Sequence, residues 1–292
     1  MQRRGRAHWL FLAPATLHLA VFALIPILYA LYLSFFRANL IKDEKVFTGI
    51  RNYQLAFTDE SFWNALWNSA VFAALSVPFG MMVALAVALL VAQRLKGMAI
   101  FRTIFYIPAI TSVLSISMLW IYIYLPEKGA INMLLGALGV TNTTDFLNNS
   151  AYAMPALIFM SAWTGLGPRM VIFLAGLMGI PPTLYEAASL DGASNWRQFW
   201  SVTLPMLGPT TFFVAVTSTI SAFQIFTPVY MMTKGGPDGA TDVVGYHIYT
   251  EAWMNFHTGL ASAKSFILLA AIAAVALVQI RLMRTQMSGH GT

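Results

Sequence analysis

The chain has 292 residues, of which 58% are hydrophobic and 10% are charged. A water-soluble domain carries about 25% charged residues, so this composition excludes an ordinary soluble protein and indicates an integral membrane protein. The chain has no cysteine, which excludes disulfides, thiolate metal centres and cysteine nucleophiles. The net charge of +6 comes from basic residues near the ends of apolar runs, which argues for membrane orientation and against binding of nucleic acid.

Long apolar runs recur along the chain, and each is long enough for the roughly 20 residues that cross a bilayer. Lipid offers no partner for backbone N–H and C=O groups, so we expect these runs to form helices. The first run is longer than the roughly 7–15 apolar residues of a secretory signal, and we expect it to remain as an uncleaved first helix. We therefore predict an all-α integral membrane protein with six transmembrane helices, over 9–36, 66–93, 101–124, 153–178, 204–230 and 259–281.

The distribution of charge between the connecting segments predicts the orientation of the helices. With a cytoplasmic N-terminus, nine basic residues fall in short inner segments: Arg3, Arg4, Arg6, Arg94, Lys96, Arg102, Arg197, Arg281 and Arg284. The outer segments then hold six basic residues together with nine of the eleven acids. This asymmetry satisfies the positive-inside rule, so both termini are predicted to be cytoplasmic.

The outer segment 48–67 combines tryptophans with acidic residues, namely Trp63 and Trp67 with Asp59 and Glu60. A helix that lies in the membrane interface has this mixture of aromatic and polar residues. We therefore expect an interfacial helix between the first two spans.

The inner segment between the fourth and fifth spans has strong local structure signals. Thr183 and Glu186 have the spacing of a capping box, which predicts the start of a short helix. Gly192 can adopt the left-handed conformation that ends a helix, and Ser194 can cap the next one. From these residues alone, the segment is either a compact contact surface for another protein or an ordinary loop at the membrane interface.

The motifs of this loop resemble a known family. Glu186-Ala187-Ala188, Asp191-Gly192-Ala193 and Leu204-Pro205 are similar to the EAA loop of bacterial ABC-importer permeases. The stretches 49–53, 233–237 and 261–263 resemble the carbohydrate permeases of the maltose and glycerol-3-phosphate type. The resemblance implies a type I importer permease fold in which this loop docks on a cytoplasmic ATPase subunit, with Glu186 and Gly192 as its coupling positions.

The resemblance also implies an organisation and a set of partners. Residues 1–65 would hold the N-terminal tail, the first span and the outer interfacial segment. Residues 66–284 would form a five-helix permease core with the EAA loop at 181–205, and 285–292 a cytoplasmic tail. The partners would be a second permease subunit, two ATPase subunits and an extracytoplasmic substrate-binding protein, in the inner or plasma membrane of a bacterium. The chain itself would bind no cofactor, and ATP and Mg would bind to the ATPase subunits.

The sequence contains no nucleotide-binding loop of its own. The stretch nearest to the G-x-x-x-x-G-K-[ST] pattern is Gly259–Ser265, and it lacks the second glycine. Energy for transport is therefore expected from a partner.

Away from the terminal residues of the predicted spans, two charged residues remain inside them, Arg169 and Lys264, and insertion of a charge there costs about 2.5–3.5 kcal/mol. Lys264 is close to the outer end of the sixth span, so we expect it to extend to the lipid headgroups. Arg169 follows Gly165-Leu166-Gly167-Pro168, a run that weakens the helix. Arg169 could line a substrate pathway, where its planar donors would hold an anionic group or a sugar hydroxyl, or it could extend to the interface.

The fifth predicted span offers further pathway candidates. Phe223, Phe226 and Tyr230 would share one face of a continuous helix, with Gln224 beside them. Aromatic rings and an amide would suit the apolar face and the hydroxyls of a sugar, whereas helix packing or lipid contact is the alternative.

The sequence argues against two other classes of function. An ion-coupled carrier normally needs an acid within a span, and the predicted spans contain none. A membrane-embedded enzyme needs a nucleophile with a base or a metal cluster, and the five histidines are scattered. The importer is therefore preferred, with a sugar, glycerol-3-phosphate or another small solute as its cargo.

Overall fold

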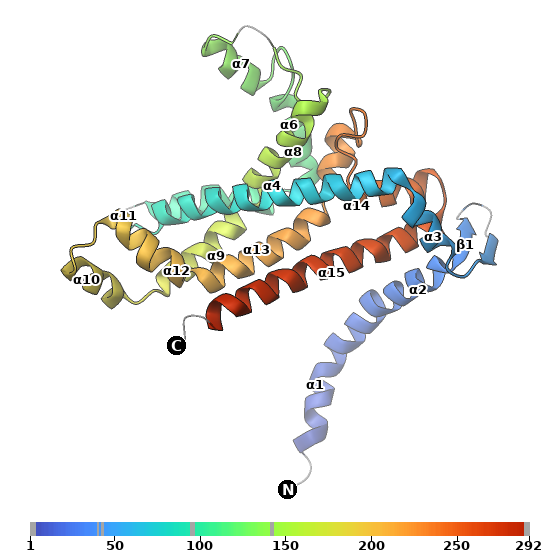
Figure 1. Cartoon of the computed structure of the whole chain (residues 1–292), viewed down its shortest axis with the longest axis horizontal. Helices are drawn as coiled ribbons and strands as arrows, with labels where there is room; N and C mark the ends of the chain where they lie inside the picture. The colour runs from blue at the N-terminus through green and yellow to red at the C-terminus, as the bar shows by residue number, and fades with distance from the viewer. Residues whose placement is uncertain (1–3, 40, 42–43, 94–96, 141–142, 289–292) are drawn as a thin grey trace. The chain divides into compact units, whose positions relative to one another are not determined.

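The computed structural model describes residues 4–39, 41, 44–93, 97–140 and 143–288. Helices dominate these residues, as predicted (Figure 1). The chain divides into two compact units, Met1–Trp63 with His247–Ala271 and Asn64–Tyr246 with Ile272–Thr292. Arg3, Arg94, Lys96 and the end of the predicted cytoplasmic tail lie outside the described residues.

The first unit begins with the first predicted span. It consists of α1 (Arg4–Leu19), the π-helix η1 (Ala20–Leu24) and α2 (Ile25–Ser34). The apolar stretch Phe11–Ser34 has none of its most apolar window buried. Apolar side chains that the rest of the described chain leaves uncovered are favourable in lipid and unfavourable in water. The structure therefore agrees with a membrane-spanning segment here.

A β-hairpin follows the first span and corrects the all-helical expectation. Strands β1 (Phe36–Asn39) and β2 (Glu44–Phe47) pair antiparallel, with Phe36 opposite Phe47.

The interfacial helix expected over 48–67 is also two elements rather than one. It consists of α3 (Arg51–Thr58) and the start of α4 (Glu60–Val91), with Asp59 between them. Asp59 Oδ1 accepts hydrogen bonds from the backbone N–H groups of Ser61, at 3.0 Å, and Phe62, at 3.3 Å. Asp59 therefore caps α4 and separates it from α3.

The remainder of the first unit comes from the other end of the chain. Helix α14 (Val244–Tyr249), the π-helix η4 (Thr250–Met254) and α15 (Thr258–Ser288) follow one another, and their part from His247 to Ala271 belongs to the first unit. Thr258 Oγ1 donates to the carbonyl of Ala38 at 3.0 Å. A Cβ on Gly259 would collide with the carbonyl oxygens of Phe36 and Leu33, so glycine permits this close approach.

Lys264 corrects the expectation that it extends to the headgroups. Its side chain is fully buried, and its Nζ lies 2.7 Å from Asp59 Oδ2, 2.8 Å from Glu251 Oε2 and 3.0 Å from His247 Nε2. His257 Nδ1 contacts the other oxygen of Glu251 at 2.8 Å. We call Asp59, His247, Glu251 and Lys264 the ion cluster.

The ion cluster changes the acidity of its carboxyl groups. Burial alone would raise the pKa of Asp59, but hydrogen bonds from Lys264 and Ser61 outweigh burial and lower the pKa to about 2. Burial also opposes ionisation of Glu251, and hydrogen bonds from Lys264 and His257 again lower its pKa. The ligand atoms of Asp59, His247 and Glu251 lie close enough together for a metal ion, but the Lys264 ammonium already bonds to all three.

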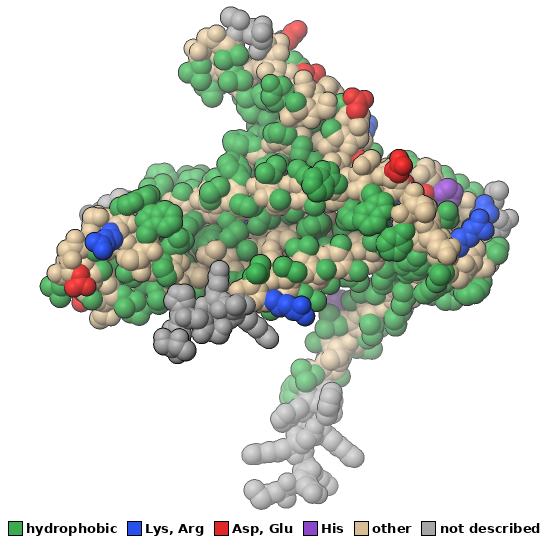
Figure 2. Space-filling view, viewed as in Figure 1, with side chains coloured by type: hydrophobic (Ala, Val, Ile, Leu, Met, Phe, Trp, Pro, Cys, Tyr) green, Lys and Arg blue, Asp and Glu red, His purple; other side chains and the backbone are tan. Residues whose placement is uncertain are grey.

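The second unit is a bundle of apolar helices, several of which are bent. Besides most of α4 it contains α5 (Met98–Ile110), α6 (Val113–Ile123), α8 (Ser150–Thr164), α9 (Leu166–Met178) and α13 (Gly208–Phe223), and the short helix α7 (Ala130–Ala137) lies beyond α6 (Figure 1). Hydrophobic side chains cover most of the visible surface of α4 (Figure 2). Within this bundle, the buried residues Ala84, Ala88, Met170, Phe173 and Val214 join α4, α9 and α13.

The number of membrane spans depends on how the bent helices are counted. Three helices of the described chain are long and apolar enough to cross a membrane, and up to six spans result if each bent pair forms one. The bends measure 100° between α5 and α6, 51° between α8 and α9, and 64° between the helix ending at Met206 and α13. The predicted helices 101–124, 153–178 and 204–230 are therefore interrupted.

Candidate functional site

The loop over 181–205, which we call the coupling loop, begins with α10 (Pro182–Leu190). Gly192, with φ +76°, ends this helix. The N–H of Ala193 donates to the carbonyl of Ala188 at 2.9 Å, and that of Gly192 to Ser189 at 3.0 Å. These two bonds form a Schellman motif, so the prediction of a left-handed turn at Gly192 is confirmed.

The second half of the coupling loop turns back onto the first. It contains α11 (Asn195–Gln198), the π-helix η2 (Phe199–Thr203) and α12 (Leu204–Met206). Gln198 Nε2 donates to Ser189 Oγ at 2.9 Å, and the hydroxyls of Tyr185 and Thr203 lie 2.9 Å apart. The loop is thus cross-linked by its own side chains, and α10 and α11 lie together at one end of the second unit (Figure 1).

The two predicted caps of the coupling loop have different outcomes. Ser194 Oγ accepts from the N–H of Arg197 at 3.4 Å, so its capping role is confirmed. The capping box of Thr183 and Glu186 is wrong, because α10 has Pro181 at its N-cap position and no side-chain cap. Pro182 suits the first helical position, which places Thr183 one residue inside the helix.

The coupling loop presents most of its side chains to the outside. Neither α10 nor α11 contains a buried residue. Glu186, Ala187, Asp191, Gly192 and Pro205 are exposed, whereas Ala188, Ala193 and Leu204 are half-buried. Leu190 is 90% exposed and Trp196 71% exposed. Apolar side chains this exposed fit both interpretations left open by the sequence, a contact surface for another protein and a loop at the membrane interface.

A cavity of about 340 Å³ in the second unit contains the other predicted site residues. It lies where helices break: at Val113 after the bend of α5 and α6, at Gly165 between α8 and α9, and at Gln224 after α13. Interrupted helices in a membrane are tolerated where they line a cavity, because backbone groups there find partners other than lipid. We call this space the Arg169 cavity.

Arg169 is the charged residue among those that line the cavity. Its Nε donates to Ser218 Oγ at 3.1 Å, and its buried Nη1 has no hydrogen-bond partner in the described part of the chain. A Cβ on Gly165 would come 2.8 Å from Nη1, and one on Gly80 would also collide with it. The two glycines therefore leave the space that the guanidinium fills.

The other predicted pathway residues are only partly brought together. Gln224 and Phe226 line the Arg169 cavity, and Phe226 stacks on Tyr230 with ring centroids 5.4 Å apart. Phe223 is buried and lines a separate cavity with Pro78 and Thr219. The prediction that Phe223, Phe226 and Tyr230 share one helix face is wrong, because α13 ends at Phe223 and the π-helix η3 begins only at Val229.

Sequence reasoning missed the small polar residues of the cavity. Ser76, Ser161, Thr164 and Ser221 line it together with Arg169. Serine and threonine within apolar spans were the available signal, but their side chains also bond to the preceding turn of a helix, as Thr164 does to Met160 at 2.9 Å. Their common location therefore depends on the bends.

Bent apolar helices around a partly polar cavity are the arrangement expected of a membrane permease. A sequence profile described as "Binding-protein-dependent transport system inner membrane component" matches residues 76–285. The chain belongs to this family. The prediction that it is a permease component, and not an enzyme in its own right, is therefore confirmed.

Individual relatives match over nearly the whole chain. The probable ABC transporter permease protein YurN of Bacillus subtilis is 34% identical over 280 residues, which cover 95% of this chain and 96% of that protein. The sn-glycerol-3-phosphate transport system permease protein UgpA of Agrobacterium fabrum is 32% identical over 274 residues, or 94% of this chain and 93% of that protein.

A solved structure has the same fold. It is a bacterial alginate ABC transporter in complex with an alginate pentasaccharide-bound periplasmic protein. Its similar chain has a TM-score of 0.83 and 22% identity, with 97% of this chain and 96% of that chain covered. The predicted ABC-importer permease fold is confirmed at this level.

Proposed function

We propose that this chain is the membrane-spanning permease subunit of an ATP-driven importer of a sugar or a related polar solute. The family membership supports the transporter class. Among the relatives, UgpA is named for glycerol-3-phosphate transport and AmyD for transport of starch degradation products. The single observation that carries the proposal is the exposed, internally hydrogen-bonded coupling loop.

The proposed subunit has six spans and cytoplasmic termini in a bacterial inner or plasma membrane. It works with a second permease subunit, two ATPase subunits and an extracytoplasmic substrate-binding protein. This chain binds no cofactor, and ATP with Mg binds to the ATPase subunits. The binding protein in the alginate transporter complex supports the last of these partners.

The coupling loop would transmit motion because its two halves are hydrogen-bonded to each other. A groove on an ATPase subunit would receive α10, with the exposed Glu186 carboxylate on one turn and the Gly192 turn at its end. Exposed Leu190 and Trp196 would supply the apolar contact. ATP-driven closure of the ATPase subunits would then move this loop and the attached helices between outward-facing and inward-facing states.

The Arg169 cavity would lie on the solute pathway. Its serine, threonine and glutamine side chains are suited to hydroxyl groups, and the ring of Phe226 to the apolar face of a sugar. The unpartnered Nη1 of Arg169 offers a donor to a solute oxygen or to an anionic group.

The experiment that tests the function uses vesicles containing this chain, its candidate partner subunits and the loaded binding protein. Gly192→Pro removes the left-handed turn and one of its hydrogen bonds. Gly139→Pro is the matched control, since Gly139 has φ +91° at the end of α7 and its N–H bonds to Gly136. We expect Gly192→Pro to reduce uptake about tenfold or more, because displacing the turn costs about 1–2 kcal/mol or more.

ATP hydrolysis distinguishes the outcomes. In Gly192→Pro, stimulation by the loaded binding protein should be lost, and Gly139→Pro should keep it. Equal effects of the two variants, or uptake by this chain without an ATPase, would contradict the proposal. Arg169→Gln in the same vesicles should lower uptake while ATP hydrolysis without solute is unchanged.

A further inference from the structure

A second pocket, with a volume of about 550 Å³, lies entirely within the first unit. Arg37 on β1, Arg51 at the start of α3 and His257 just before α15 line it, with Thr48 and Asn52. None of the described residues that line it is acidic. Arg37 and Arg51 therefore give its described lining a positive charge, while His257 is paired with Glu251.

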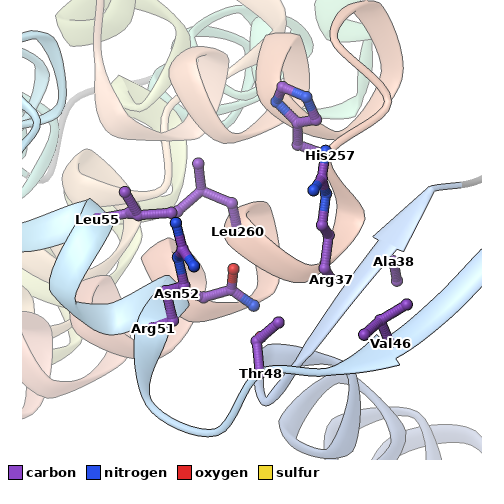
Figure 3. Close-up of a pocket in the computed structure, with 9 residues that line it drawn as sticks. All are labelled: Arg37, Ala38, Val46, Thr48, Arg51, Asn52, Leu55, His257 and Leu260. Atoms are coloured by element: carbon purple, nitrogen blue, oxygen red, sulfur yellow. The ribbon is translucent and has the colours of Figure 1, made fainter.

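The positive side chains surround the pocket from different elements. Arg37 extends toward His257 on one side, and Arg51 lies on the other side beside Leu55 and Leu260 (Figure 3). Neither arginine forms an ion pair with an acid in the part of the chain that the structure describes. Two guanidinium groups that line one pocket, without an ion pair among the described residues, are suited to an anion with several oxygens.

Hydrogen bonds that do not include the two arginines hold the floor of the pocket. The Asn52 amide donates to the carbonyls of Ser34, at 2.8 Å, and Phe36, at 2.9 Å. His257 Nδ1 is bonded to Glu251, which leaves Nε2 for a ligand. Because these contacts fix the surrounding backbone, the pocket exists before a ligand enters it.

The position of the pocket along the membrane helices indicates which anion it meets. The first apolar span ends at Ser34 and the last begins at Thr258. Thr258 bonds to Ala38, so these two ends lie at one level. The end of a span is where lipid headgroups begin, and a pocket at this level therefore faces the phosphate layer of the bilayer.

The surroundings of the pocket are apolar. Val46 and Phe47 on β2 are 58% and 69% exposed, and Leu55 is 46% exposed. The adjoining helix α2 exposes Ile27 and Leu28 as well. A soluble anion would leave this apolar rim exposed to water, whereas the acyl chains of a lipid would cover it.

We propose that this pocket binds the phosphate of an anionic phospholipid headgroup. Arg37 and Arg51 donate to the phosphate oxygens, and Thr48 and the free nitrogen of His257 lie within the same pocket. The acyl chains run along the exposed side of α2. The bound lipid thereby fastens the hairpin and α3 to the end of the first span.

The test measures lipid binding to the purified full-length chain in detergent by native mass spectrometry. The probes are phosphatidylglycerol, phosphatidylcholine and, as a soluble phosphate, glycerol phosphate. Arg37→Gln/Arg51→Gln removes both guanidinium groups. Lys45→Gln/Lys128→Gln is the control, because it removes the same charge from exposed residues that do not line the pocket.

We expect the unmodified chain and the lysine control to retain phosphatidylglycerol in preference to phosphatidylcholine. The arginine variant should lose that preference by about tenfold or more, because it removes two charge-assisted contacts to the phosphate. Displacement of the lipid by millimolar glycerol phosphate would identify a soluble phosphate as the ligand of the same site. Circular dichroism and the melting temperature verify that the variants are folded.

Equal retention of phosphatidylglycerol by the arginine variant and the control would overturn the proposal. Capture of the substrate-binding protein by the arginine variant and by the lysine control is compared as a second measurement. Unchanged lipid binding together with loss of this capture would also overturn the proposal, and would assign the pocket to a carboxylate of a protein partner. The lipid measurement needs no ATPase and no transport, so its failure would leave the proposed function unaffected.

Discussion

Lys264 is a cation in an apolar helix, and its surroundings explain how the chain tolerates it. An ammonium group has three N–H donors and no acceptor. Asp59, Glu251 and His247 take one donor each. His247 Nε2 must therefore act as an acceptor, with the ring proton on Nδ1.

The substitution Lys264→Met measures the importance of this cation, because the methionine side chain has a similar length and no charge. The variant leaves Asp59 and Glu251 near each other without a counter-charge. Breaking a buried ion pair in this way should lower the free energy of unfolding by about 3–5 kcal/mol. The melting temperature in detergent is the measurement, and Lys128→Met at an exposed position should leave it nearly unchanged.

The acidity of the cluster predicts how stability depends on pH. The folded chain lowers the pKa of Asp59 from its ordinary value of 3.8 to about 2, and lowers that of Glu251. A carboxyl with a lowered pKa stabilises the fold fully above its unfolded value, and this contribution is lost as the pH falls toward the folded value. The melting temperature of the unmodified chain should therefore fall more steeply from pH 4 to pH 2 than that of Lys264→Met. Parallel curves would show that the cluster does not couple to folding.

At the scale of elements, a glycine sets the contact between α9 and α5. A Cβ on Gly167 would lie 2.8 Å from the Phe105 oxygen and 2.8 Å from Tyr106 Cα. These are backbone atoms and cannot rotate away. Small residues at such crossings let membrane helices approach closely.

Gly167→Ala should consequently separate the two helices and destabilise the chain by about 1–3 kcal/mol, the usual cost of overpacking. Gly208→Ala is the control, because a Cβ at Gly208, the first residue of α13, meets nothing within 4 Å. Thermal unfolding of both variants in detergent compares them. A loss of stability at Gly208 equal to that at Gly167 would point to the general cost of replacing glycine instead.

Local signals predicted some helix ends and not others. Gly165 and Gly167 before Pro168 indicated a weak point, and a bend is found there. The break after Phe223 lies just before Pro228. Proline has no N–H for the carbonyl four residues earlier, that of Gln224, and its ring collides with it, a signal that the predicted continuous helix over 204–230 did not use. An apolar run shows where a span is expected, but a break that lines a cavity is stabilised by neighbouring helices.

For the whole molecule, composition and the coupling-loop motifs were enough to predict the class of protein. Absence of charge over long runs is a direct consequence of burial in lipid, so the positions of the spans could be predicted. The partners of Lys264 could not, because Asp59 is 205 residues away in sequence. Likewise, Ser76, Ser161 and Ser221 meet around one cavity only after three separate helices have packed.

The distance in sequence between Asp59 and Lys264 has a consequence for biogenesis. The first unit draws on both ends of the chain, Met1–Trp63 and His247–Ala271. A chain that emerges from the ribosome with its N-terminus first must hold the first span and the hairpin without their partners while Asn64–Tyr246 is synthesised and inserted. Insertion of α15 is thus the step that completes the packing of the first unit. A chain truncated before Lys264 would leave the first span and the hairpin without these partners.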